Sequence, residues 1–352
     1  MAKAAVGQIC SSNSMAHNLE QCVKLVGRAA SAGAKVLFLP EASDYIATST
    51  SESFSLARPL SSSPFVLGLQ SAAAKHSIAV HVGIHVPVSV APTSPSPSPS
   101  NPVVPTVPIS PPSSSPNPPS PTTPQTKLYN RTIYIQPNGT LLPSGSYDKL
   151  HLFDYGALRE SASVQAGSRF TAPFESPVGR LGSLVCFDLR FPEAAVHLTR
   201  CPPARNPQTP SPSLPAQILL YPSAFTVPTG SAHWALLLRA RAVETQSWVI
   251  ASAQVGRHNA CSPRVSYGRS MVVDPWGRVV LELKGVVRQN QSNSTGDGKA
   301  VDEKGMKEQE EQWEAEDGAV GELGIVDIDL DEWARVREKM PLVRRTDVYP
   351  QV

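Results

Sequence analysis

Apolar runs that are long enough for buried strands alternate along the chain with amphipathic helical patterns. The clearest run, KVLFLP at residues 35–40, is almost continuously apolar, which is typical of a strand buried on both faces. It follows residues 15–30, where apolar side chains recur at helical spacing, and Gly33, a residue type that commonly ends helices. This alternation predicts sheets layered against helices, and therefore a mixed α/β fold.

The remaining pattern extends this prediction over most of the chain. We expect strands at 4–10, 77–90, 179–187, 217–221, 247–253 and 323–328, hairpins at 127–142 and 270–283 that turn at 137–139 and 274–277, and helices at 193–199, 232–246 and 331–339. We find no internal repeat.

Three segments lack this patterning. Of the chain's 35 prolines, 14 lie in residues 91–126 and 6 in residues 202–215, and residues 290–318 are strongly acidic. Such segments bury too little apolar surface to offset their ordering entropy, so we predict a disordered Pro/Ser-rich insert, a Pro-rich loop and an acidic loop within one domain spanning 1–352. An alternative for 91–126 is a docking tract for proline-binding modules, because PxxP spacings occur in it.

Composition excludes several classes of protein. A net charge of +2 gives no general electrostatic case for nucleic-acid binding. The five cysteines are widely spaced and form no metal-ligand pattern, so we expect neither a metal nor a disulfide framework, and no cofactor. No apolar run approaches the roughly 18 residues that span a bilayer, and no targeting segment is recognisable, so we expect a cytoplasmic protein that binds no membrane.

Three residues are candidates for a catalytic role. Glu41 directly follows the buried run at 35–40, where burial should raise its carboxyl pKa and suit it to act as a general base. Lys149 lies between aromatic and apolar neighbours, which favours partial desolvation. Cys186 ends the apolar run GRLGSLVC, at a strand-to-helix junction that is typical of a nucleophile elbow.

Taken singly, each residue has an ordinary structural explanation: a strand-end carboxylate, a solvated loop lysine and a small buried thiol. Together they supply a base, a cation and a nucleophile from strand ends and adjoining loops. Those three groups are the minimum for attack on an unactivated amide or nitrile carbon. We also expect the Lys149 cation to lower the pKa of the Cys186 thiol, so that Glu41 and Cys186 share a proton near neutrality.

Three blocks around these residues, LFLPE at 37–41, YDKLHLFD at 147–154 and VCFDLRFPE at 185–193, resemble the signature blocks of the nitrilase superfamily of carbon–nitrogen hydrolases. The resemblance implies a single-domain, four-layer αββα sandwich and a Glu41-Lys149-Cys186 triad. It also implies a role for Glu160 in orienting Lys149 or the attacking water. A homodimer or higher homo-oligomer, with sheets packed across a two-fold axis, is the expected assembly.

Blocks in the second half, among them YPSAF at 221–225, RARAVETQ at 239–246 and SYGRSMVVDPWG at 266–277, resemble the Nit branch of the superfamily. That branch is known for hydrolysing deaminated glutathione, so the resemblance implies an amidase that forms 2-oxoglutarate and cysteinylglycine through a cysteine thioester. An ω-amidase acting on 2-oxoglutaramate, a nitrilase and a non-catalytic scaffold remain alternatives. Ala235 and Arg269 depart from residues frequent in relatives and put fine specificity in doubt.

The resemblance also suggests further site residues. The backbone N–H of Phe187 is expected to join Lys149 in stabilising the oxyanion, and candidate contacts to a carboxylate-bearing small-molecule amide are Arg190, Ser223, Phe225 and His233. Structural interpretations compete with some of these roles. Pairing with each other or bracing of the elbow is favoured for Arg190 and Glu193, an ion-pair network for Arg239, Arg241 and Glu244, and structural hydrogen bonds for His233 and His258.

Overall fold

The computed structural model describes residues 1–90, 125–155, 158–200, 214–260, 262–288, 312–345 and 347–349. Its larger sheet has six strands in the order β17 (Leu323–Ile328), β1 (Ala2–Gly7), β2 (Val36–Phe38), β3 (Ala79–Val90), β4 (Gln125–Ile135) and β5 (Tyr147–Asp148). The central strands β1, β2 and β3 are parallel, whereas β17, β4 and β5 pair antiparallel to their neighbours.

The second sheet has five strands in the order β14 (Val279–Glu282), β13 (Met271–Val273), β10 (Trp248–Ala251), β9 (Ile218–Leu220) and β8 (Leu181–Ser183). Strands β8, β9 and β10 are parallel, and the β13–β14 hairpin completes one edge. Three short ribbons pair β6 (Asp154–Tyr155) with β7 (Leu158–Arg159), β11 (Val255–Arg257) with β12 (Val265–Tyr267), and β15 (Val286–Arg288) with β16 (Trp313–Ala315).

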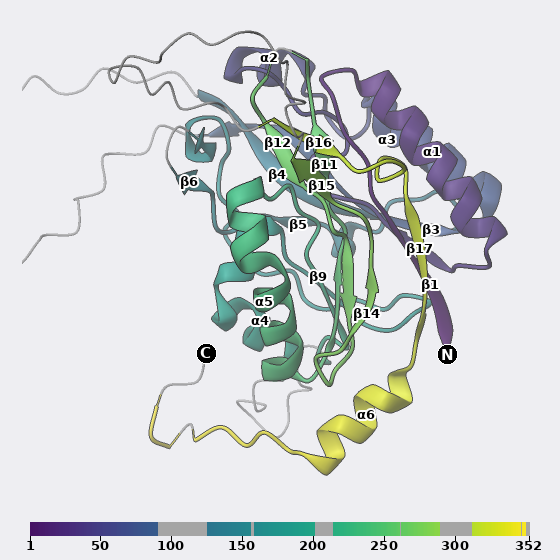
Figure 1. Cartoon of the computed structure of the whole chain (residues 1–352), viewed down its shortest axis with the longest axis vertical. Helices are drawn as coiled ribbons and strands as arrows, with labels where there is room; N and C mark the ends of the chain where they lie inside the picture. Colours follow the sequence, from purple (N-terminus) through teal and green to yellow (C-terminus); the bar gives the residue numbers. More distant parts are fainter. Residues whose placement is uncertain are drawn as a thin grey trace, which may run out of the picture.

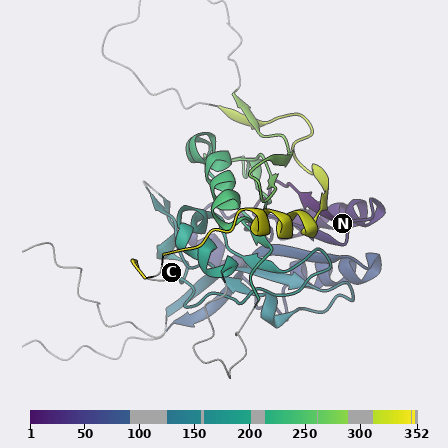
Figure 2. The same ribbon diagram turned by 90° about the horizontal axis from the view of Figure 1, so that it is seen from below.

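Helices cover the two outer faces. Helices α1 (Met15–Ser31) and α3 (Pro64–His76) pack on the first sheet, and α4 (Pro192–Thr199) and α5 (Val227–Thr245) pack on the second, so that the strands lie between two helical layers (Figure 1). Helix α2 (Thr50–Leu56) lies near the site, and α6 (Leu330–Lys339) lies across one end of the molecule (Figure 2). Short 3-10 helices span Pro143–Gly145, Glu160–Ala162 and Cys186–Arg190.

The alternation of side chains along each strand explains these layers. In β2, Leu37 faces α1 and α3, whereas Val36 and Phe38 face the second sheet. In β9, Leu219 faces the helices, whereas Ile218 and Leu220 face the first sheet. Burying an apolar side chain of this size contributes about 1.5–3 kcal/mol, so both faces of each sheet are stabilised by packing. The predicted four-layer αββα sandwich is confirmed.

Two helices of this architecture, α2 and α3, were not predicted from the sequence. Helix α3 begins with a local signal: Ser63 accepts a hydrogen bond from the Val66 N–H as N-cap, and Pro64 occupies the first turn. The predicted hairpin at 127–142 is mostly the long strand β4, which returns through a single bridge between Ile135 and Leu141.

The insert boundaries also differ from those predicted. Strand β4 begins at Gln125, and residues 313–315 of the acidic segment form β16 against β15. Residues 214–215 and 312–318 are likewise described, whereas residues 91–124, 202–213 and 290–311, with the disorder predicted for them, lie outside the described residues. Among the residues described, no helix is both long enough and apolar enough to cross a bilayer.

Candidate active site

Glu41, Lys149 and Cys186 come from three separate strand ends and line one cavity of about 500 Å³. Glu41 follows β2 and Lys149 follows β5 in the first sheet, whereas Cys186 follows β8 in the second. The cavity therefore opens where corresponding edges of the two sheets meet. Parallel strands bring their carboxyl ends to one edge, which explains why residues far apart in the sequence converge here.

The main chain at Glu41 is held by close contacts. A Cβ atom on Gly83 of β3 would lie 2.6 Å from the Glu41 Cα atom, so only glycine allows the two segments to approach. The buried Gln254 donates from Nε2 to the Glu41 carbonyl oxygen at 2.9 Å. Gln254 lies in the second half of the chain, and its structural role could not be read from local sequence pattern.

Cys186 occupies a strained turn. Its φ is +46°, in the left-handed region that non-glycine residues rarely adopt, and a 3-10 helix, Cys186–Arg190, begins at this residue. Such strain is characteristic of functional positions. The turn directs the thiol toward Glu41, to which it donates a hydrogen bond, while the Ala224 N–H donates to the sulfur. This geometry matches the predicted nucleophile elbow.

Lys149 lies between two carboxylates. Its Nζ donates to Glu41 Oε1 at 2.9 Å and to Glu160 Oε1 and Oε2 at 3.0 and 2.9 Å, with the Lys149 side chain only 2% exposed. The Asn130 amide adds a second bridge, donating to Glu41 Oε1 at 2.7 Å and to Glu160 Oε1 at 3.0 Å. Both carboxylates are thereby fixed in position, and Asn130 is a site residue that the sequence analysis did not identify.

The pKa of Glu41 corrects the sequence-based prediction. Burial raises this carboxyl pKa, as expected, but the charge of Lys149 and hydrogen bonds from Lys149, Cys186 and Asn130 outweigh burial and hold it below 4.5. The expectation of a raised pKa was wrong because it considered burial without the partners. Glu41 is therefore ionised in the unliganded protein.

The pKa of the Cys186 thiol is raised, whereas we expected it to be lowered. Burial and the neighbouring Glu41 charge raise the thiol pKa well above 9.0, more than Lys149 lowers it. Burial lowers the Lys149 pKa, but the charges of Glu160 and Glu41 overcome this and raise it well above 10.5. At neutral pH the proton thus rests on sulfur, beside an anionic base and an ammonium, rather than being shared between Glu41 and Cys186.

Asp188 joins the lysine segment to the cysteine segment. Its fully buried carboxylate accepts from the Val185 N–H at 2.9 Å, the Tyr147 hydroxyl at 2.8 Å and the His151 N–H at 3.0 Å. One side chain therefore fixes β5 and the Lys149 loop against the turn that carries Cys186. No local pattern signals this role, because Tyr147 and His151 lie 41 and 37 residues away from Asp188.

Two of the four candidate substrate contacts line the cavity and two do not. Arg190 and Phe225 line the cavity, whereas His233 lies behind Arg190 and accepts from its Nη2 at 3.1 Å. Ser223 does not line the cavity: its fully buried hydroxyl donates to the Tyr221 carbonyl oxygen at 2.9 Å. A structural role explains Ser223 better than substrate contact does. No ion pair between Arg190 and Glu193 is present among the described residues.

Other structural interpretations are confirmed in part, since Arg239 donates to the Gly277 carbonyl oxygen at 3.0 Å. Arg241 pairs with Glu244 at 2.9 Å and also donates twice to the Leu189 carbonyl oxygen. His258 is buried between the Ser11 carbonyl oxygen and the Ser266 hydroxyl, and burial lowers its pKa to about 3. Ala235 and Arg269 lie outside the cavity lining. Within the described part of the chain, no cluster of three or more His, Cys, Asp or Glu side chains has metal-binding geometry.

The fold and the site together define a carbon–nitrogen hydrolase. The sequence profile of that family, described as "Carbon-nitrogen hydrolase", matches residues 3–104 and 113–338, and the chain belongs to this family. It is a member of the nitrilase superfamily, as the signature blocks indicate.

The chain is also similar to individual proteins of known sequence or structure. The chain is 35% identical to "Probable hydrolase nit2" of Schizosaccharomyces pombe, over the full length of both chains. It is 36% identical to "Deaminated glutathione amidase" of Mus musculus, over 78% of this chain and 72% of the mouse protein. The solved structure of the Caenorhabditis elegans NitFhit protein matches all of this chain and 68% of its own, with a TM-score of 0.69 and 29% identity.

Proposed function

We propose that this enzyme is an amidase that hydrolyses deaminated glutathione to 2-oxoglutarate and cysteinylglycine through a thioester on Cys186. The observation that carries the proposal is the hydrogen-bonded arrangement of Cys186, Glu41 and Lys149 in one cavity. The substrate follows from relatives named deaminated glutathione amidase, which are about 35% identical over most of the chain. The cavity volume lies in the range that holds small-molecule ligands.

Acylation begins with sulfur attack on the amide carbonyl. Glu41, ionised and hydrogen-bonded to the thiol, accepts the Cys186 proton as the new C–S bond forms. The developing oxyanion lies near the Lys149 ammonium and the Phe187 N–H, which the 3-10 helix leaves unused because it lies in the first turn. Protonated Glu41 then transfers its proton to the departing nitrogen, the C–N bond breaks and the amine leaves.

Deacylation reverses the proton transfers with water as the nucleophile. Glu41, ionised again, removes a proton from water, the C–O bond forms and the C–S bond breaks, and the sulfur regains its proton. Glu160 keeps Lys149 in position throughout because it accepts two of the bonds from the ammonium. Arg190, the cavity cation on the side of the Cys186 turn, is our candidate for the carboxylate of the 2-oxo acid half.

A comparison of two amides tests the proposed substrate. We expect purified enzyme to show a kcat/KM for deaminated glutathione at least about tenfold above that for 2-oxoglutaramate, because only the former uses the whole cavity for binding. Formation of 2-oxoglutarate is followed in both assays, in the same buffer. A ratio that favours 2-oxoglutaramate would identify an ω-amidase instead.

We also propose a cytoplasmic homodimer, in line with the expectations above. Exposed apolar side chains on α5, Leu236 and Val243, lie on the same side of the molecule as Trp276 in the adjoining β13–β14 turn, where Gly277 packs against Val243. Exposed apolar patches of this kind commonly mark contact surfaces between subunits.

A further inference from the structure

His85 lies beside the base on the wall of the cavity that the first sheet forms. It is two residues beyond Gly83 on β3, and alternate residues of a strand face the same side. Gly83 is in contact with the main chain of Glu41. His85 is also directly opposite Asn130 on β4, so the two side chains share a face, and Asn130 donates to Glu41. Two independent relations thus place His85 next to the general base.

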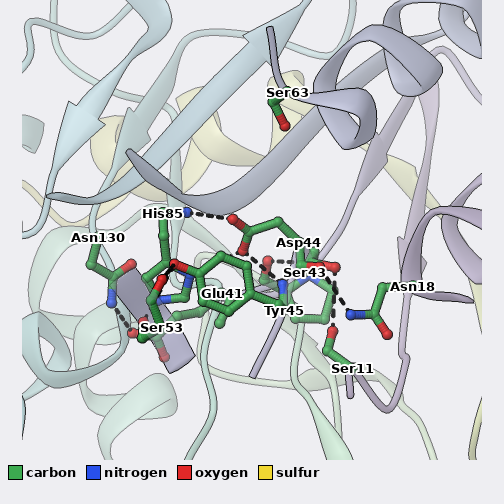
Figure 3. Close-up of polar contacts among 12 residues, drawn as sticks. Ser11, Asn18, Glu41, Ser43, Asp44, Tyr45, Ser53, Ser63, His85 and Asn130 are labelled. Atoms are coloured by element: carbon green, nitrogen blue, oxygen red, sulfur yellow. Dashed lines mark hydrogen bonds and ion pairs between the residues drawn. The ribbon is translucent and has the colours of Figure 1, made fainter. Parts of the chain in front are cut away.

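The imidazole of His85 is held by Asp44. The buried Asp44 carboxylate accepts from the His85 backbone N–H at 2.8 Å and from Nδ1 at 3.0 Å, and the Tyr45 ring stacks on the imidazole at 4.6 Å (Figure 3). An ionised carboxylate only accepts hydrogen bonds, so Nδ1 carries a proton. Nε2 has no hydrogen-bond partner among the described residues, and His85 lines the cavity. The ring is therefore preorganised with one polar atom available to a ligand.

The chemistry of the reaction identifies that ligand. Glu41 transfers its proton to the departing nitrogen, so the leaving group must occupy the part of the cavity beside Glu41, where His85 lies. An imidazole that donates from Nδ1 to Asp44 and from Nε2 to a second carboxylate carries a positive charge and forms charge-assisted hydrogen bonds with both. Arg190 lines the cavity from the 3-10 helix that begins at Cys186, and would bind the acyl half.

We propose that His85 is a specificity-determining residue that binds the carboxylate of the leaving group, which in cysteinylglycine is the glycine carboxylate. This inference rests on the proposed function. It explains how the site distinguishes an amide with a large anionic leaving group from a primary amide that releases ammonia. Asp44 acts through His85 as a positioning residue.

The test compares two substrates that share an acyl half. In His85→Phe, the ring and its stacking on Tyr45 remain but both nitrogens are lost. We expect kcat/KM for deaminated glutathione to fall about tenfold to a hundredfold, since one charge-assisted bond is lost. The value for 2-oxoglutaramate, which has no leaving-group carboxylate, should change by less than about twofold. His85→Gln, which retains a donor toward Asp44, covers the case in which His85→Phe fails to fold.

His197→Phe is the matched control, because His197 is exposed, stacks on Phe170 and lies outside the cavity. It should leave both values unchanged. Equal losses for the two substrates in the His85 variants, or no loss for either, would overturn the role of His85 while the proposed function stands. Wild-type protein that hydrolyses 2-oxoglutaramate but not deaminated glutathione, or neither of them, would overturn the proposed function and the role of His85 together.

Discussion

Replacing Lys149 with methionine is expected to abolish measurable amidase activity and to lower the free energy of unfolding by about 3–5 kcal/mol. Methionine has nearly the same length but no charge, so Glu41 and Glu160 lose the ammonium that bonds both at 2.9–3.0 Å. The buried Glu41 carboxylate and the partly buried Glu160 carboxylate then repel each other without a counter-ion, and removing one partner of a buried ion pair is costly for this reason. The oxyanion loses its cation at the same time, which alone costs about 10²–10³ in kcat.

Urea unfolding at pH 7, combined with the amidase assay, measures both effects. Lys24→Met is the matched control, because Lys24 forms an exposed i,i+4 pair with Glu20 and such pairs contribute about 0.3–0.5 kcal/mol. If Lys149→Met were as stable as Lys24→Met and retained turnover, neither the buried ion-pair cluster nor the oxyanion role would hold.

Replacing Glu41 with glutamine should reduce kcat by about 10³-fold and leave the protein folded, because a positioned general base contributes about 10²–10⁴. The amide preserves the shape of the side chain but cannot accept the thiol proton. The thiol pKa lies well above 9.0, so Cys186 depends on this base for its reactivity at neutral pH. We therefore also expect iodoacetamide to alkylate Cys186 more slowly in Glu41→Gln at pH 7.

The kcat/KM of the wild type should fall at low pH, where Glu41 becomes protonated. Glu41 must be ionised, and its pKa lies below 4.5, so kcat/KM of the wild type should be independent of this group above that pH and fall only at lower pH. Glu175→Gln, at an exposed carboxylate outside the cavity lining, is the control and should match the wild type. Wild-type rates of turnover and alkylation in Glu41→Gln would rule out this residue as the base.

Much of this architecture could be predicted from local sequence pattern. The run at 35–40 contains strand β2, which is buried between helices and the second sheet because each of its apolar side chains packs against one of these layers. Cys186 is at an elbow because the apolar strand ends there and Pro192 begins the next helix. By contrast, α3 was missed although Ser63 and Pro64 signal its start, because its apolar positions do not form one narrow stripe.

The parts that could not be predicted depend on partners distant in the sequence. Asn130 donates to Glu41 and Glu160, which lie 89 and 30 residues away from it in the sequence. Asp188 accepts from Tyr147 and His151, which lie 41 and 37 residues away. No local pattern encodes such contacts. The pKa of Glu41 was predicted in the wrong direction for the same reason: its burial can be read from the sequence, but the number of hydrogen bonds it accepts cannot. The place of His85 beside the base depends likewise on its register with β4.

Capture of the acyl-enzyme tests the central claim most directly. Enzyme turning over deaminated glutathione is quenched with acid after increasing times and digested, and the peptide that contains Cys186 is analysed by mass spectrometry. We predict that this peptide carries a 2-oxoglutaryl group during turnover, and that Cys186→Ala, folded by circular dichroism, shows neither the adduct nor turnover. An unmodified Cys186 peptide at every quench time, together with turnover by the folded Cys186→Ala protein, would contradict the account.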